Sequence, residues 1–316
     1  MVKNTKLNLL KKLFCYFTIM TEQAFKKSKL SFRMINKCCF HCFLLFSLSS
    51  IISLQADAQY FYKDLWSNRQ VIKEFAILKK DNLKTIKIKS FEDDGEPSEG
   101  FFCEKKINKN YTQSQMISKS NITSQSLLVS DYNNAGLPVK TTDDTPNSTS
   151  ITEYKYDDNG KLSLVKTVTK GNDDSESIVE THEYFYDQNG EPVKMLRKKN
   201  NLLISTITFS SDANGNVIEE NVEGNSAVDK KYYYYYDDKN RLTDVVHYND
   251  RAGRLLPNYM YEYNSANQLT QMISTEEGNS NYLIWQYTYN DKNLRETEKC
   301  FSKEKRLLGT IQYSYQ

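Results

Sequence analysis

The sequence predicts an all-β fold, a continuous antiparallel β-meander of tandem hairpin repeats with about 14 to 16 strands. Aromatic residues recur every 24 to 30 residues, a glycine or asparagine follows each at a fixed distance, and apolar and polar residues alternate between them. Open sheets rarely exceed roughly 10 strands without curling. We therefore expect an open half-shell or open barrel, preceded by a short N-terminal helix.

The chain begins with a segment typical of a secretory signal peptide, residues 1–58. Arg33 and Lys37 precede a short apolar run that ends in the small-residue site Ala56–Ala58. This pattern favours cleavage after residue 58, and the run is shorter than the roughly 20 apolar residues that span a bilayer. Because the leader is long for a signal peptide, we expect translation to begin at Met34 or Met20.

Export determines the charge and location expected of the mature chain. Without residues 1–58 it has 33 Lys and Arg against 38 Asp and Glu, a net charge of −5. This balance provides no basic stripe for a phosphate backbone, so we expect no nucleic-acid partner. We expect the product in the periplasm, at the cell surface or outside the cell, without a transmembrane span in the mature chain. An outer-membrane barrel is disfavoured, because Lys and Glu recur where its lipid-facing band would lie.

Residues 59–90 differ from the rest and are expected to form an N-terminal cap. From Asp64 to Leu78, apolar residues follow a spacing close to that of a helix, as with Leu65, Ile72 and Phe75. Repeat arrays commonly cover an open end with an atypical unit. We expect a helix over the first strands, and the repeat array itself at 91–316.

Eight turns of the array share one design. Four residues after an anchoring aromatic, or after Ser211 in its place, stands a glycine or asparagine, the residues that enter the left-handed region most easily. A type I turn closed by such a residue joins hairpin strands, and a preceding Asp or Asn accepts hydrogen bonds from the turn. The eight predicted turn residues are Gly95, Gly136, Gly160, Gly190, Gly215, Asn240, Asn267 and Asn293.

The residues around these turns resemble the tyrosine-aspartate (YD) repeats of Rhs and teneurin shells. The motif is clearest in Tyr154–Leu162 and Tyr184–Val193 and is similar in later copies, so the resemblance covers roughly residues 125 to 316. The resemblance implies strands wound into a shell. In the family such a shell can enclose a toxic C-terminal domain, and we expect this chain to be a short exported bacterial member without one. A second polar turn separates successive motifs, and residues 141–150 are expected to be a loop.

Paired tyrosines are the most unusual feature of the mature chain, which has 22 of them. Equivalent positions on successive hairpins should stack into ladders that stabilise the sheet. The same rings could instead form a platform that stacks on sugars or on a partner protein. The candidate ligand-binding aromatics are Trp285, Tyr154, Tyr184, Tyr234, Tyr261 and Tyr287.

Catalysis and cofactors are not indicated by the sequence. The mature chain has two histidines, His182 and His247, without the spacing of a metal site, so we interpret both as ordinary strand residues. We expect no metal and no cofactor. The predicted function is therefore a non-catalytic envelope or extracellular protein that binds a surface polysaccharide or a partner protein through its aromatic sheet. The alternative is a polysaccharide hydrolase with carboxylates converging in a cleft of the curled sheet.

The two mature cysteines test the predicted openness of the sheet. Cys103 and Cys300 lie near opposite ends of the array. Neighbouring strands lie about 4.8 Å apart, so an open sheet would keep the two sulfurs far beyond bonding distance. We expect two reduced thiols.

Overall fold

The computed structural model describes residues 60–316, except 173–175, 225–229, 251 and 276–280. All of them belong to one compact unit of the chain, Leu44–Gln316. The predicted signal peptide, its cleavage site and the predicted translation starts lie outside the described residues. No helix in the described part is long and apolar enough to cross a membrane.

The described chain consists of one helix followed by eighteen strands. The helix is α3 (Tyr62–Lys80). The first nine strands are β1 (Thr85–Glu92), β2 (Phe102–Ile107), β3 (Gln113–Lys119), β4 (Ser126–Tyr132), β5 (Pro138–Asp144), β6 (Ser148–Tyr156), β7 (Leu162–Gly171), β8 (Ile178–Tyr186) and β9 (Pro192–Lys199). The remaining strands are β10 (Leu202–Ser211), β11 (Val217–Gly224), β12 (Lys230–Tyr236), β13 (Leu242–Asn249), β14 (Arg254–Tyr263), β15 (Leu269–Thr275), β16 (Tyr282–Tyr289), β17 (Arg295–Ser302) and β18 (Leu307–Tyr315).

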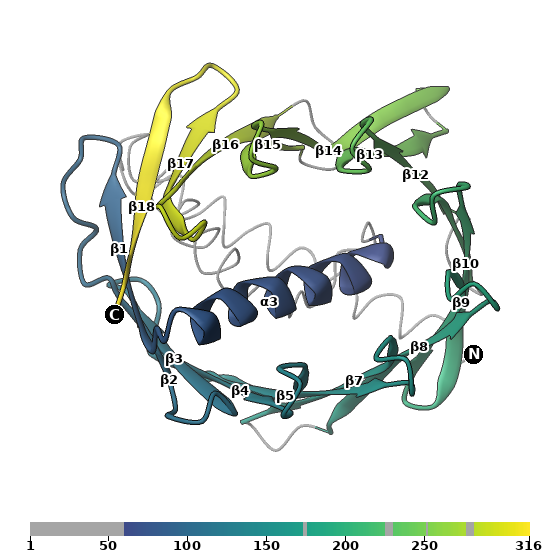
Figure 1. Cartoon of the computed structure of the whole chain (residues 1–316), viewed down its shortest axis with the longest axis horizontal. Helices are drawn as coiled ribbons and strands as arrows, with labels where there is room; N and C mark the ends of the chain where they lie inside the picture. The colour runs from purple at the N-terminus through teal and green to yellow at the C-terminus, as the bar shows by residue number, and fades with distance from the viewer. Residues whose placement is uncertain (1–59, 173–175, 225–229, 251, 276–280) are drawn as a thin grey trace, which may run out of the picture. The chain divides into compact units, whose positions relative to one another are not determined.

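The strands form one antiparallel sheet that closes into a barrel (Figure 1). Each strand pairs with the next one along the chain, and β1 pairs with both β2 and β18. Ile88 lies opposite Cys103 on one side and opposite Tyr313 on the other. The predicted meander is therefore confirmed, but the prediction of an open sheet of 14 to 16 strands is wrong. Closure pairs the two terminal strands, which would otherwise expose unsatisfied main-chain groups along an edge.

Closure also brings the two cysteines closer together than an open sheet would. Cys103 lies on β2 and Cys300 on β17, so only β1 and β18 separate their strands in the ring. Both are buried and both are free thiols. Burial raises the pKa of each to about 12, which makes them poor nucleophiles at neutral pH.

Antiparallel order places successive connections on alternate edges of the barrel. The connections after β4, β6, β8, β10, β12, β14 and β16 form one edge, which we call the turn rim. The connections after the odd-numbered strands from β1 to β17 form the opposite edge, which we call the loop rim. The predicted turns at residues 136–293 lie on the turn rim, whereas Gly95 follows β1 and lies on the loop rim.

The turn-rim connections repeat one hydrogen-bonded geometry. In the first YD-like motif the carboxylate Oδ1 of Asp157 accepts hydrogen bonds from the main-chain N–H groups of Asn159 and Lys161, at 3.0 and 2.8 Å. Asp237 makes the same pair of contacts. All eight predicted turn residues have positive φ, from 57° to 86°. The repeated Asp is thus a turn former that satisfies its own backbone.

The left-handed turn position gives a first testable prediction. Gly160 has a φ of +75°, and a Cβ added there would meet no heavy atom within 4 Å. Gly160→Ala should therefore lower the free energy of unfolding by about 1 kcal/mol through backbone strain alone, measured by urea unfolding. Asn240→Gly, at the equivalent position with a φ of 57°, is the control and should cost nothing. Equal losses in both variants would contradict the strain argument.

Tyrosine hydroxyls join successive repeats on the inner side of the turn rim. The second tyrosine of each pair donates to the main-chain carbonyl of a residue at or near the start of the preceding odd-numbered strand, at 2.6–2.9 Å. The donors are Tyr156, Tyr186, Tyr236, Tyr263, Tyr289 and Tyr315. Ser211 occupies the corresponding position on β10, and its shorter hydroxyl has no hydrogen-bond partner.

This ladder gives a second prediction. Tyr236→Phe removes the bond to the carbonyl of Val217, 2.8 Å away, and should cost about 1 kcal/mol of unfolding free energy. Its neighbour Tyr235 is 48% exposed, so Tyr235→Phe should have almost no effect. Both are read from urea-unfolding midpoints. A loss of equal size in the two variants would show that the ladder does not stabilise the barrel.

The segment 141–150 is strand rather than loop. β5 extends to Asp144 and β6 begins at Ser148, so only three residues connect them. Thr141 and Ser150 are buried in these strands, and the hydroxyl of Ser150 lies 2.9 Å from that of Thr169. The prediction of a loop was wrong because polar residues of this stretch, such as Thr141 and Ser150, are buried in the paired strands β5 and β6.

Candidate functional site

The helix α3 lies inside the ring of strands (Figure 1). It is confirmed as a helix, but it packs against strands from the middle of the array and not only against the first ones. Leu65 and the preceding aromatic Tyr60 belong to one buried cluster with Tyr184 on β8 and Tyr234 on β12. Further along the helix, Phe75 stacks on Tyr132 of β4 with ring centroids 3.8 Å apart.

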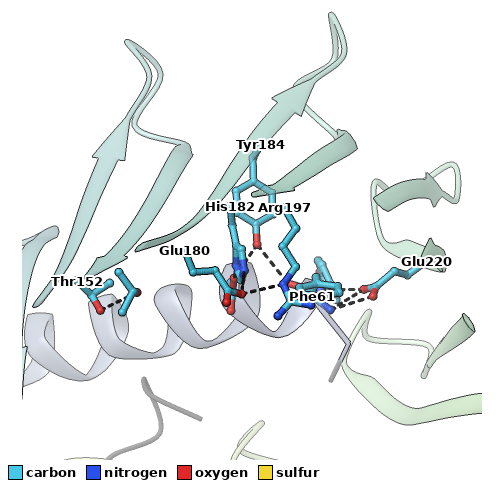
Figure 2. A network of polar contacts seen from close by, with 10 residues as sticks. Phe61, Thr152, Glu180, His182, Tyr184, Arg197 and Glu220 are labelled. Carbon is cyan, nitrogen blue, oxygen red and sulfur yellow. Dashed lines mark hydrogen bonds and ion pairs between the residues drawn. The ribbon is translucent and has the colours of Figure 1, made fainter. Parts of the chain in front are cut away.

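The amino end of α3 is held by the carboxylate of Glu220 on β11 (Figure 2). The main-chain N–H of Phe61 lies 2.9 Å from Oε1 and 3.0 Å from Oε2, and the N–H of Tyr62 donates to Oε2 at 2.9 Å. The hydroxyl of Tyr234 donates to Oε2 at 2.7 Å. Phe61, the N-cap residue, offers no side-chain cap of its own. Glu220 therefore supplies the acceptor that the first N–H groups of a helix require, at the positive end of the helix dipole.

Glu220 is an unusual residue for this position because it is fully buried. Burial raises the pKa of its carboxyl to about 7, against the opposing effect of the hydrogen bonds from Phe61, Tyr62 and Tyr234. A carboxylate in such surroundings is stable only when its oxygens are well satisfied. The donors Phe61, Tyr62 and Tyr234 satisfy the carboxylate oxygens of Glu220. These hydrogen bonds fix the position of the amino end of α3.

One turn into the helix, Asp64 joins a second group of charged residues, of which Glu180, His182 and Arg197 are labelled in Figure 2. Its Oδ2 lies 2.6 Å from Nδ1 of His182 and accepts the hydroxyl hydrogen bond of Tyr184 at 2.9 Å. Nε2 of His182 lies 3.0 Å from Oε1 of Glu180, which also accepts Nε of Arg197 at 2.8 Å. The guanidinium of Arg197 in turn lies over the ring of Phe61, 5.5 Å from its centroid. The network thus runs from the helix across β8 to β9 and back to the helix.

The electrostatics of this group favour a charged histidine. Burial alone would lower the pKa of His182, but the charges and hydrogen bonds of Asp64 and Glu180 raise it to about 9. Burial would raise the pKa of Glu180, but hydrogen bonds from His182 and Arg197 lower it to about 2. At neutral pH the network is therefore an alternating chain of anions and cations, with both ring nitrogens of the imidazolium acting as donors.

Aromatic contacts complete the attachment of α3. The ring of Tyr60 meets Tyr234 and Tyr259 in edge-on contacts at 5.9 and 5.7 Å. Trp66 packs on Tyr261 at 5.9 Å. Such aromatic pairs contribute beyond the apolar area that they bury. The inner aromatic wall of the middle strands is thus the binding surface for the helix.

The candidate ligand-binding aromatics lie on this inner wall. Trp285 is 2% exposed, and Tyr184, Tyr234, Tyr261 and Tyr287 are also buried. Tyr154 is partly buried and packs against the same core. Tyr154, Tyr184, Tyr234 and Tyr261 therefore pack in the cluster that also holds the start of α3. Ligand binding by these four residues, and by Trp285 and Tyr287, stays a prediction.

Five charged residues of these two groups were not predicted as site residues: Asp64, Glu180, His182, Arg197 and Glu220. His182 had been interpreted as an ordinary strand residue, yet it is the centre of the charged group. A signal was present in the sequence, because Glu180, His182 and Tyr184 are spaced two residues apart and therefore face the same side of β8. For Glu220 the sequence held no comparable signal, since Glu219 beside it has the same side chain and points to the opposite face. Within the described ranges, no group of His, Cys, Asp and Glu is arranged to hold a metal ion.

Comparisons with known proteins give only distant similarity. No family model and no curated protein matches the chain. Among solved structures, the crystal structure of TcdB2-TccC3 aligns with 12% identity and a TM-score of 0.35 over 72% of this chain and 14% of that chain. The complex TcdB2-TccC3-Cdc42 aligns with 13% identity and a TM-score of 0.31 over 67% of this chain and 13% of that one. A porin-like protein from Bacteroides uniformis aligns with 10% identity and a TM-score of 0.28 over 74% and 98%.

The chain thus spans about one seventh of the TcdB2-TccC3 chain that it matches. TM-scores of 0.35 and below assign the chain to no family. By its own strand pairing it is a closed β-barrel of tandem hairpin repeats with a helix bound inside.

Proposed function

We propose that this chain is a non-catalytic, exported repeat protein of the cell envelope or extracellular space. Its barrel acts as a rigid scaffold that holds its own helix and binds an envelope polysaccharide or a partner protein through its outer face. The observation that supports this most directly is that the titratable side chains inside the barrel are engaged in hydrogen bonds and ion pairs. Asp64, Glu180, His182, Arg197 and Glu220 are bonded to one another or to the amino end of α3.

The outer face of β8 to β12 offers the aromatic surface for such binding. Nζ of Lys194 lies over the ring of Phe185 on β8, 4.7 Å from the ring centroid. Nζ of Lys231 lies over the ring of Tyr233 on β12, 5.4 Å from the ring centroid. Tyr235, two residues further, is 48% exposed. Rings with one wet edge stack well on the apolar faces of sugars, and the lysines beside them can donate to hydroxyl or carboxylate oxygens.

The alternative, a polysaccharide hydrolase, has one observation in its favour. The pKa of Glu220 is raised to about 7, which is the range of a general acid at neutral pH. Its Oε2, however, already accepts hydrogen bonds from Tyr62 and Tyr234. A substrate would have to displace the end of α3 to reach it, so the structural role is the better explanation of the raised pKa.

The test is co-sedimentation of the purified exported protein with insoluble envelope and plant polysaccharides, with release of soluble sugar measured in the same tubes. We expect binding without release. The double variant Phe185→Ala and Tyr235→Ala should lose binding, whereas Tyr248→Ala, which removes an equally exposed tyrosine near the loop rim, should retain it. Release of sugar would establish the hydrolase instead, and unchanged binding by the double variant would exclude the β8 to β12 surface.

A further inference from the structure

Closure of the barrel joins strands from both ends of the array into one outer surface. The strands β17, β18, β1, β2 and β3 are consecutive in the ring, and we call their outward side the seam face. Buried and exposed residues alternate along β1, so one side of this strand faces solvent. β1 and β10 lie on opposite sides of the ring (Figure 1). The seam face is therefore remote from the β8 to β12 surface.

The outward charges of the seam face are mostly positive. Two glutamates share this side of the five strands, all of whose residues are described. Glu104 is half-buried and bonds to Lys106 at 2.9 Å, and the exposed Glu296 lies at the turn-rim end of β17. The exposed lysines of the seam face are Lys87 and Lys89 on β1, Lys106 on β2, Lys119 on β3 and Lys299 on β17. Apart from the pair with Glu104, four lysines thus stand against one exposed carboxylate.

The two rims that border the seam face differ in charge. On the turn rim, Lys79 and Lys80 end α3, Lys84 precedes β1 and Lys109 follows β2, and the half-buried Asp81 lies among them. The acidic residues of the loop rim at these strands are Asp93, Asp94, Glu96, Glu99 and Glu304. The positive charge of the seam face thus continues onto the turn rim and ends towards the loop rim, although the mature chain has a net charge of −5.

An exposed aromatic ring lies among the lysines of the seam face. Phe102 on β2 is 43% exposed and lies opposite Lys119 on β3. On the other neighbouring strand, Ile88 pairs with Cys103. This register brings Lys89, the next residue of β1, beside Phe102. Lys89 and Lys119 are therefore two strand spacings apart, about 10 Å, with the ring between them.

This arrangement suits a chain of acidic sugars. The apolar face of a sugar ring stacks on an aromatic ring, and the ammonium groups on either side can donate hydrogen bonds to carboxylates. Gln115, Gln312 and Ser314 are exposed on the same face and can bond to sugar hydroxyls. A nucleic acid fits less well, because proteins that bind single strands provide several rings for successive bases. Phe102 is the one ring exposed on these fully described strands.

The curvature of the barrel favours a flexible ligand over a flat one. The lysines lie on β17, β1, β2 and β3 of a curved wall, so their side chains diverge, and a polymer chain can follow the curve. We propose that the seam face binds an acidic polysaccharide, with one sugar ring stacked on Phe102 and the carboxylates of successive sugars paired with the surrounding lysines. This second surface depends on the proposed export of the protein, which brings it to such polymers, and not on binding at β8 to β12.

The test is fluorescence anisotropy of labelled polygalacturonate fragments titrated with the purified exported protein. We expect binding that weakens as salt is added. Fragments whose carboxylates are methyl-esterified keep the same sugar rings without the charge, and they should bind at least about tenfold more weakly. A single-stranded oligonucleotide with the same number of charges should also bind more weakly than the acid fragments.

The double variant Lys87→Glu with Lys89→Glu should bind the acid fragments at least about tenfold more weakly, because repulsion replaces two charge-assisted contacts. Phe102→Ala should weaken this binding and reduce the preference over the oligonucleotide. The matched control is Lys155→Glu with Lys170→Glu, which makes the same change in net charge at two exposed lysines of β6 and β7. This control should bind as the unchanged protein does, and far-UV circular dichroism should show that all variants remain folded.

The variant Lys119→Glu with Lys299→Glu, on other strands of the seam face, should lose binding in the same way and replaces the first variant if that one does not fold. The proposal is overturned if the unchanged protein does not bind the acid fragments, or if it binds the esterified fragments or the oligonucleotide equally well. It is equally overturned if the lysine variants bind like the matched control. The variant Phe185→Ala with Tyr235→Ala should bind the acid fragments normally, so failure of the β8 to β12 surface and failure of the seam face are measured separately.

Discussion

Replacement of Glu220 by alanine is expected to lower the free energy of unfolding by about 3–5 kcal/mol, because several buried donors lose their acceptor together at about 1–3 kcal/mol each. The variant leaves the N–H groups of Phe61 and Tyr62 and the hydroxyl of Tyr234 without their acceptor. Each unsatisfied buried donor carries its own desolvation cost. The loss should appear first at the amino end of α3, because two of the three donors belong to it.

The chain provides its own probe for this experiment. Its two tryptophans are Trp66 on α3 and Trp285 on the barrel wall, so a Trp285→Phe background leaves fluorescence that reports on the helix. In that background, Glu220→Ala should shift the emission of Trp66 at denaturant concentrations where the far-UV signal of the strands is still intact. If the emission and the strand signal change together, α3 is not a separately anchored element.

The neighbouring residue is the matched control. Glu219 lies on the outer face of the same strand and pairs with Lys231 at 2.9 Å, with 27% of its side chain exposed. Partly exposed ion pairs contribute about 0–1 kcal/mol, so Glu219→Ala should be nearly neutral. A large loss in this variant as well would show that β11 tolerates no substitution, and would remove the case for a specific anchor.

Much of the local structure could be predicted from sequence because it is fixed by single residues. A glycine or asparagine after an Asp, as at Asn240 after Asp237, specifies both a positive φ and the acceptor that closes the turn. The alternation around Tyr154 and Tyr156 likewise specifies which side chains share a face. The residues that carry these signals lie close together in the sequence, so the structure of each hairpin can be predicted from its own residues.

Closure of the barrel and the place of the helix could not be predicted in this way. Closure depends on the summed twist and stagger of eighteen strands, and neither β1 nor β18 has a sequence that marks it as a partner of the other. The helix was predicted from the spacing of Leu65 and Phe75. The same spacing is expected for a helix that caps the open end of a sheet and for a helix enclosed by a barrel. What distinguishes the two is Glu220, whose importance depends on a contact 159 residues away in sequence, at Phe61.

The charged group around His182 should make the stability of the protein depend on pH in the alkaline range. The pKa of His182 is raised to about 9 in the folded state, against about 6.5 in an unfolded chain. A raised pKa means that the folded state binds the proton more tightly. The stabilisation is therefore fully present below pH 6.5 and is lost as pH rises through 9. The difference corresponds to roughly 3 kcal/mol, measured as the decline of the urea-unfolding free energy between pH 6 and 9.

The variant His182→Gln should lose most of this decline, because glutamine does not titrate, and it should be less stable than the unchanged protein at pH 6 but much closer to it at pH 9. The decline that remains in the variant, through about pH 7, comes from Glu220, whose pKa burial raises to about 7. His247 provides the control, since its Nδ1 pairs with the uncharged side chain of Asn258 at 2.8 Å. His247→Gln should leave the decline in place. If His182→Gln retains the full pH dependence, the imidazolium does not hold Asp64 and Glu180 together, and the anchoring of α3 must rest on Glu220 and the aromatic contacts alone.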